Sequence, residues 1–331
     1  MNRAKISELA VYLPERVVSN AEIEARINVR RTILPPGGLQ RLFGIETRRY
    51  AASDQQVSDL ATAAAQAIVD KVGASNIEFM IFAAACADLI EPATCNMVQH
   101  KLGLRCPAMD IKNACNSFTS ALMTASSFIQ AGIYNHVLVV NGEKLSDAVR
   151  FDYNDETQLV KHLAGLSLGD AGAAALVSRS LDESGLCFQK FMTKGEHWEL
   201  CTIKGGGSMY PHDAGKNYFE GQTAELKEVL AKTAHTFFHE CMIESEWEIG
   251  EIQHFFTHQV SIGTTRLIAQ LTKIDPSKIE EVFSRYGNTA AASIPLAMHQ
   301  RLCRGEIQKG DKIAWVGLAA GVSASVQLMI W

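Results

Sequence analysis

The chain has 331 residues, of which 47% are hydrophobic and 20% charged, and its formal net charge is -5. This composition is typical of a globular protein with enough apolar material for a large core. The small negative charge argues against a general nucleic-acid-binding protein and gives no indication of an anionic membrane surface as a partner. The length favours two domains, or one large domain with two halves.

The cysteines and the hydropathy pattern favour a cytoplasmic protein. The eight cysteines form no CxxC pair and show no metal-ligand spacing, so we expect reduced thiols and no metal site. The first residues carry no recognisable signal, and no apolar run reaches the roughly 18 residues that cross a bilayer. We therefore expect no stable membrane insertion.

Strands and helices alternate along the first half of the chain. Continuous apolar runs predict buried strands, and apolar residues at helical spacing predict helices. The expected strands are residues 6–13, 77–85, a run that ends at 115, 136–140 and 173–177, and the expected helices are 21–27, 58–72, a segment that ends at 102 and a segment between 115 and 132. Residues 151–163 are polar without an apolar period, so we expect an excursion over the surface there.

The second half repeats this order of elements without a clear sequence repeat. The expected strands are residues 186–192, 252–257, 282–286, 312–318 and 323–330, and the expected helices are 225–241, 264–271 and 291–302. We take residues 178–184 as the link and expect an N-terminal half, residues 1–178, and a C-terminal half, residues 179–331. The alternation of strands and helices across both halves predicts an α/β protein.

Cys115 lies where a predicted buried strand runs into a predicted helix. At such a junction, unpaired backbone N–H groups and the positive end of the helix dipole stabilise a thiolate, which is the nucleophilic form of cysteine. A lone cysteine more commonly packs as a small apolar side chain. Two motifs further along the chain favour the functional interpretation.

His258 and Asn288 also follow predicted strands, in Thr257-His258-Gln259 and Gly287-Asn288-Thr289. Strands that deliver side chains at their ends build sites at one edge of a sheet. Cysteine with histidine is sufficient for acyl transfer, and asparagine adds a hydrogen-bond donor. The same three residue types occur in cysteine proteases, where asparagine orients histidine, and spacing alone does not separate the two arrangements.

Four motifs in order along the chain carry a resemblance to a known family. They are DIKNACNSF at residues 110–118, LGDAGA at 168–173, FTHQ at 256–259 and YGNTAAASIP at 286–295. The chain resembles β-ketoacyl-acyl-carrier-protein synthase III enzymes of the thiolase superfamily over essentially its whole length. The resemblance implies a thiolase-like, five-layered α-β-α-β-α fold with two pseudo-symmetric halves, and a homodimer.

The resemblance also implies an acyltransferase that joins two acyl thioesters by Claisen condensation, in fatty-acid, polyketide or related secondary-metabolite biosynthesis. Cys115 would carry the first acyl group, and His258 and Asn288 would bind the second thioester and stabilise its enolate. The backbone N–H groups of Cys115 and Ala320 would form the oxyanion hole. The partners would be acyl-CoA or acyl carrier protein. We expect no cofactor, because coenzyme A or phosphopantetheine arrives with the substrate.

Three segments depart from the acetyl-CoA-specific initiating enzymes of the family. The loop 34–45 has glycine at the aligned position of a tryptophan that holds coenzyme A, and residues 259–263 lack an asparagine and an arginine of the pattern. The closing turn at 318–323 reads LAAGVS in place of a triple glycine. These differences argue against a standard initiating enzyme.

The loops 35–45 and 89–94 are more similar to the head-to-head acyl-condensing enzymes of bacterial olefin synthesis. In those enzymes the glutamate before the loop proline reaches across the dimer and is placed to deprotonate an acyl α-carbon. The resemblance assigns this role to Glu91, with a solvated loop carboxylate as the alternative.

Other functions and residues stay open at this point. The alternatives are a decarboxylative initiating synthase that uses acyl-CoA and a malonyl carrier protein, acyl transfer to an alcohol or amine, a silent scaffold subunit and a cysteine hydrolase. We expect structural roles for Glu143, His254, His235 and His239, and packing roles for the cysteines other than Cys115. Basic residues that could contact a phosphopantetheine or a carrier protein are Arg30, Arg31, Arg41, Arg48, Arg49 and Lys216.

Overall fold

The computed structural model describes residues 3–29 and 34–331, and these residues form two large sheets. The first sheet has the strand order β1-β7-β6-β4-β5. Its strands are β1 (Ala4–Tyr12), β7 (Ala171–Arg179), β6 (His136–Glu143), β4 (Phe79–Ala83) and β5 (Ala108–Ile111). β4 is parallel to β5 and β6, whereas β7 is antiparallel to its neighbours β6 and β1. β5 therefore lies at an edge of the sheet.

The second sheet has the order β11-β12-β13-β8 and comes from the later part of the chain. Its strands are β11 (His254–Thr257), β12 (Lys312–Ala319), β13 (Ser323–Ile330) and β8 (Gly185–Thr193). β11 and β12 are parallel, and the other pairs are antiparallel. No helix among the described residues is long and apolar enough to cross a membrane.

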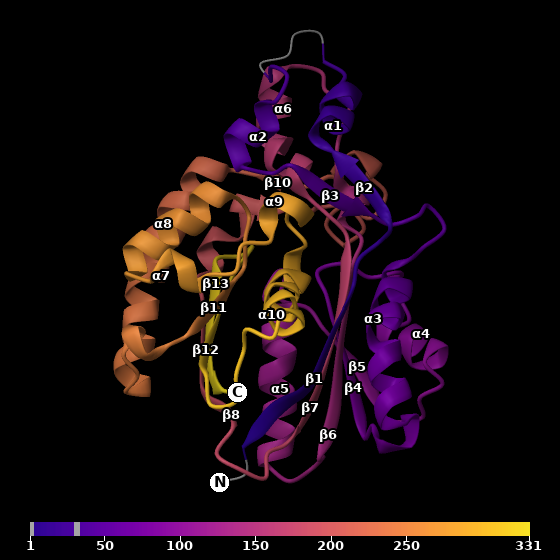
Figure 1. The fold of residues 1–331 in the computed structure, drawn as a ribbon. Coiled ribbons are helices and arrows are strands. Elements are labelled where there is room, and N and C mark those ends of the chain that lie inside the picture. Colours follow the sequence, from indigo (N-terminus) through magenta and orange to yellow (C-terminus); the bar gives the residue numbers. More distant parts are fainter. Residues whose placement is uncertain (1–2, 30–33) are drawn as a thin grey trace.

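Helices cover both sheets and separate them, which produces five layers (Figure 1). The helices α5 (Ser117–Gln130) and α10 (Ser293–Cys303) pack between the two sheets. The outer face of the first sheet is covered by α3 (Val57–Val72) and α4 (Thr94–Lys101). The outer face of the second is covered by α7 (Thr223–Ser245) and α8 (Ile262–Thr272). This α-β-α-β-α arrangement confirms the predicted fold.

The layers explain why the strands read as continuous apolar runs. In β4, Ile81 packs against the central helices, while Met80 and Phe82 pack against α3 and α4. Alternate side chains point to opposite faces, so a strand covered on both sides is apolar at every position. On α5, the buried residues Phe118 and Leu122 follow the helical spacing of the sequence.

A cap of short elements closes one end of the two sheets, at the top of Figure 1. It is formed by β2 (Arg16–Ser19), α1 (Asn20–Arg26), α2 (Gly38–Phe43), β3 (Thr47–Tyr50), α6 (Glu156–His162), β9 (Cys201–Thr202), β10 (Glu220–Gly221) and α9 (Phe283–Tyr286). Its core includes Val18, Leu39, Leu159 and Phe283. The carboxyl ends of the parallel strands face this cap, so it determines what surrounds the residues that follow them.

Two predicted segments differ in this cap. Residues 151–163 run along the surface as predicted, but they include the helix α6, which buries Leu159 and His162, and Tyr153 is also buried. Asp155 caps this helix by accepting a hydrogen bond from the Gln158 N–H. The expected strand at 282–286 is the short helix α9, whose Phe283 packs into the cap.

Candidate active site

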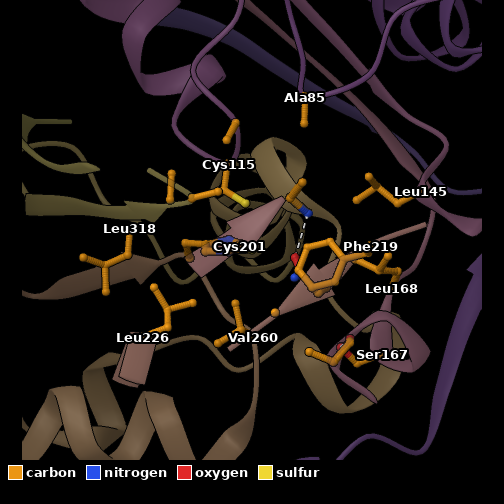
Figure 2. Close-up of a pocket in the computed structure, with 18 of the residues that line it drawn as sticks. Ala85, Cys115, Leu145, Ser167, Leu168, Cys201, Phe219, Leu226, Val260 and Leu318 are labelled. Carbon is orange, nitrogen blue, oxygen red and sulfur yellow. Dashed lines mark hydrogen bonds between the residues drawn. The ribbon is translucent and has the colours of Figure 1, made fainter. Parts of the chain in front are cut away.

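A cavity of about 250 Å³ lies between the cap and the strand ends. Cys115, His258, Asn288 and Ala320 all line it, so the structure brings together the residues that the sequence analysis placed in one site. In Figure 2 the Cys115 sulfur points into the cavity, with apolar side chains on either side of it. These side chains include Leu145, Leu168, Phe219, Leu226, Val260 and Leu318.

Cys115 lies in a tight turn between β5 and α5. Ala114 has a positive φ of 46°, which costs a non-glycine residue about 1–2 kcal/mol. The turn is closed locally: the Asn116 N–H donates to the Asn113 carbonyl (2.9 Å), and the Ser117 hydroxyl donates to the Ala114 carbonyl (2.7 Å). These bonds hold the cysteine two residues before the first residue of α5.

Burial disfavours the charged form of this cysteine. It raises the pKa of the Cys115 thiol well above its usual range, and the neighbouring Cys201 and Glu143 raise it further. The backbone N–H groups of Cys115 and Ala320 act in the opposite direction but do not outweigh burial. The N–H groups therefore favour the thiolate, as the sequence predicts for this junction, while desolvation of the sulfur opposes it.

His258 follows β11 and is buried beside the cavity. Its Nδ1 lies 2.9 Å from the hydroxyl oxygen of Ser293, the first residue of α10. Burial lowers the pKa of His258 to about 4. The imidazole is therefore neutral near pH 7, with one nitrogen as a donor and the other as an acceptor.

Asn288 follows α9 and Gly287, and its backbone is fixed by a distant segment. Its N–H donates to the Ser167 carbonyl (2.8 Å), and its carbonyl accepts from the Gly169 N–H (3.0 Å). Its side-chain Oδ1 accepts a hydrogen bond from the Ala290 N–H (3.0 Å). Because the oxygen is engaged, the amide nitrogen is the end of this side chain that can donate to a ligand.

Ala320 lies in the turn between β12 and β13, where Gly321 and Val322 both have positive φ. Its N–H interacts with the Cys115 sulfur and lowers the pKa of the thiol, as does the N–H of Cys115 itself. Two fixed N–H groups beside a nucleophilic atom can bind an oxygen that gains negative charge. This is the pair that the resemblance assigns to the oxyanion hole.

Glu91 does not line the cavity in this single chain. It lies on the exposed loop between β4 and α4, where Leu89 is 53% and Ile90 85% exposed. Any action of Glu91 in a site therefore requires a second chain, as the resemblance implies.

Several cavity residues were missed by the sequence analysis. Cys201 was predicted to be a packing residue, but it lines the cavity. Cys187 and Cys303 were also predicted to pack in the core, but they are exposed. Lys112 is the only lysine, arginine, aspartate or glutamate among the described lining residues. Its place three residues before Cys115 was a signal that could have found it. The sequence around Cys201 contained no such signal, because the strand β9 has only two residues and shows no hydrophobic periodicity.

Glu143, at the end of β6, is a buried hydrogen-bonding group, as predicted. Its Oε1 accepts from the Ala85 N–H (2.9 Å) and from the side-chain nitrogen of Asn141 (3.2 Å). Burial raises the pKa of Glu143 to about 7. Its charge therefore changes near neutral pH, within electrostatic reach of Cys115.

The remaining candidate histidines have structural contacts, as predicted, whereas Arg48 does not lie at the surface. His254 is held by Asp311 and Arg301, and His235 is exposed with its Nδ1 2.8 Å from the Leu271 carbonyl oxygen. Arg48 is fully buried, so its predicted surface role is wrong. Arg30 and Arg31 lie outside the described residues. Within the described ranges, no group of three or more His, Cys, Asp or Glu side chains is placed to hold a metal ion.

The fold and this site define a thiolase-like enzyme with a cysteine, a neutral imidazole and an amide around one cavity. Comparison with known families agrees. Residues 109–195 match 3-oxoacyl-[acyl-carrier-protein] synthase III, and residues 242–331 match its C-terminal part. The chain belongs to the β-ketoacyl-[acyl-carrier-protein] synthase III family. This family joins acyl thioesters by Claisen condensation, which confirms the predicted class of enzyme, a condensing acyltransferase.

Relatives and solved structures match over almost the full length. A β-ketoacyl-[acyl-carrier-protein] synthase III from Neisseria meningitidis is 29% identical over 340 residues, covering 99% of each chain. The 3-oxoacyl-[acyl-carrier-protein] synthase III of Aquifex aeolicus superposes with a TM-score of 0.86 at 27% identity, covering 99% of this chain and 100% of that one. Xanthomonas campestris OleA, solved with bound lauric acid and lauroyl-CoA, gives 0.89 at 26% identity, covering 99% of each chain.

Proposed function

We propose that the chain joins two apolar acyl thioesters into a β-ketoacyl product through an acyl group on Cys115. The observation that carries this proposal is the convergence of Cys115, His258, Asn288 and Ala320 on one cavity with mainly apolar walls. A hydrolase would need only the first acyl transfer. A second carbonyl-binding pair, His258 and Asn288, favours a reaction with a second thioester.

In the first half-reaction the Cys115 sulfur attacks the carbonyl of an acyl thioester. The thiol gives up its proton as the carbon–sulfur bond forms, and the neutral imidazole of His258 is the basic group of the cavity that can accept it. The Cys115 and Ala320 N–H groups bind the oxyanion, an effect worth roughly 3–4 kcal/mol for each donor elsewhere. The original thiol then leaves with a proton, and the acyl group remains on Cys115.

In the second half-reaction a second thioester binds with its carbonyl oxygen toward His258 and the Asn288 amide. Loss of an α-proton or of carbon dioxide leaves an enolate, which these two groups stabilise by hydrogen bonds. The enolate carbon attacks the acyl carbonyl, the new carbon–carbon bond forms, and the bond to the Cys115 sulfur breaks. The thiol recovers a proton, and no cofactor beyond the thiols of the substrates takes part.

We propose that a homodimer supplies the base for α-proton removal from Glu91 of the second copy. The exposed, apolar residues Leu89 and Ile90 on the same loop support its burial against a partner. Among the described residues, no strand pairs with the outer side of β5, and this edge supports a dimer in which two edge strands adjoin.

We propose acyl-CoA or acyl carrier protein as donors and a pathway in fatty-acid or related biosynthesis. The relative bound to lauroyl-CoA supports a medium or long acyl chain, as do the apolar walls of the cavity. The names of the closely matching relatives favour a second candidate, a decarboxylative synthase that uses a malonyl carrier protein.

A donor panel tests the proposal. The protein is incubated with acyl-CoA donors of increasing length, with and without malonyl carrier protein, and both protein and products are analysed by mass spectrometry. We expect an acyl mass on Cys115 and a β-ketoacyl product. Release of free acid without a condensed product would contradict the proposal, and product formation only with malonyl carrier protein would select the second candidate. Glu91→Gln should slow condensation of two acyl-CoA donors, and an unchanged rate would remove its role.

A further inference from the structure

Arg48 is a fully buried arginine on β3. Its two terminal nitrogens donate to uncharged oxygens: Nη1 to Oδ1 of Asn20 and Nη2 to the carbonyl of Leu166, both at 3.0 Å. Burial lowers the pKa of Arg48 to about 10, so the side chain remains a cation at neutral pH. Burying a cation against uncharged oxygens costs desolvation free energy. The function of the segment that contains Leu166 can account for this cost.

The segment bound by Arg48 is the segment that holds Asn288. Arg48 bonds the Leu166 carbonyl, and the next carbonyl along the chain, that of Ser167, accepts the Asn288 N–H (2.8 Å). Two residues later the Gly169 N–H donates to the Asn288 carbonyl (3.0 Å). The backbone of Asn288 is thus fixed on both sides by a segment whose own position Arg48 sets.

Residues 166–169 and 286–288 cross each other, and two glycines at this crossing allow the backbones to approach closely. A Cβ at Gly287 would lie 2.3 Å from the Ser167 oxygen, and one at Gly169 would lie 2.2 Å from the Tyr286 oxygen. The Cβ of Arg48 is also close to both positions, at 3.4 Å and 3.2 Å respectively. The stem of Arg48 therefore backs the two crossing segments, while its guanidinium holds one of them.

The turn that carries Cys115 has separate supports. Besides its local bonds, Asn116 donates to the Ser323 hydroxyl (2.9 Å) and accepts from the Ser325 hydroxyl (3.2 Å). These contacts come from β13 and do not involve Arg48. A displacement of the Leu166 segment should therefore move Asn288 and leave Cys115 in place.

We propose that Arg48 is a positioning residue for Asn288 and that it serves the condensation step selectively. The inference rests on the proposed function, in which Asn288 binds the second thioester. It gives a reason for an arginine in the core of the cap, where an apolar side chain would fill the space at a lower cost in free energy.

The test measures the two half-reactions separately. Acylation of Cys115 is followed in a single turnover by intact mass, and condensation is started by adding the second thioester to the preformed acyl-protein. We expect Arg48→Lys and Arg48→Met to slow condensation about 10- to 100-fold, the effect of moving a catalytic group by about 1 Å. Acylation should change by less than about twofold, because its supports are independent.

If Arg48→Met does not fold, Arg48→Lys is the informative variant. Lysine keeps the positive charge but lacks the two terminal nitrogens that donate to Asn20 and Leu166. The matched control is Arg16→Lys in the neighbouring strand β2, whose parent side chain is exposed and paired with Glu22. This control should leave both half-reactions unchanged. Thermal melting of each variant verifies that it is folded.

A double variant separates positioning from a general structural effect. In an Asn288→Ala background, Arg48→Lys should cause no further loss of condensation, because the side chain that it positions is gone. An equal additional loss, or an equal loss of both half-reactions in the single variant, would overturn the inference. If Arg48→Lys condenses normally while Asn288→Ala does not, only the inference fails. If Asn288→Ala condenses normally, the proposed role of Asn288 fails and the inference fails with it.

Discussion

The turn that carries Cys115 and the turn that carries Asn288 reach the same cavity by different means. The bonds that close the cysteine turn join residues three or four positions apart, such as Asn113 and Asn116. The asparagine turn is held by Ser167 and Gly169, more than 100 positions away. The nucleophile is therefore placed by bonds within its own segment and by two contacts from β13, whereas the backbone on which Asn288 lies is fixed by a single distant segment. Four substitutions test this difference between the two turns.

Replacing the nucleophile should have the largest effect. We expect Cys115→Ala to lower acyl transfer about 10⁴-fold or more, as for other covalent nucleophiles. Loss of the acyl mass adduct measures this directly. Cys201→Ala is the matched control, because this thiol lines the same cavity. An adduct that persists in Cys115→Ala and disappears in Cys201→Ala would reverse the assignment.

Removing the carbonyl-binding amide should affect only the second half-reaction. We expect Asn288→Ala to lower condensation about 10²- to 10³-fold, the loss typical of one donor to a developing oxyanion. Acylation of Cys115 should persist, because Asn288 contributes no support to that turn. Parallel loss of acylation in the single-turnover assay would show that the two turns are not independent.

Gly287→Ala should disturb the crossing without removing a functional group. The new methyl group would lie 2.3 Å from the Ser167 oxygen, and φ at this position is positive. We expect a loss of stability of at least about 1–2 kcal/mol and a condensation rate lowered about tenfold. Melting temperature and condensation rate measure the two effects. Gly195→Ala, which adds a methyl group in open space, should change neither. A Gly287→Ala protein with normal melting and rate would show that the crossing tolerates displacement.

The smallest expected effect is a pH shift at the nucleophile. Burial raises the pKa of Glu143 to about 7, and its negative charge above that pH adds to the effects that raise the pKa of Cys115. Glu143→Gln keeps an acceptor oxygen for the Ala85 N–H but removes the charge. The pKa of Cys115 should then fall, so the pH profile of acylation should move to lower pH.

The control for this shift is Glu251→Gln, since the Glu251 carboxylate is solvent-exposed and paired with Lys312. Its pH profile should match that of the parent protein. A profile that moves to higher pH in Glu143→Gln would contradict the expected sign.

The resemblance supplied the five layers, whereas the amino-acid sequence alone specified the alternation of strands and helices, the strand–helix junction at Cys115 and the motifs that contain His258 and Asn288. These features depend on local periodicity and on residues close together in the chain, so they can be read directly. Only the tertiary structure decided that α6 packs into the cap, that Cys201 reaches the cavity and that Arg48 is buried beneath Asn288. It also showed that burial opposes the thiolate form of Cys115, because desolvation depends on everything that surrounds the sulfur. Contacts between segments that are distant in the sequence set these properties, and no local pattern encodes them.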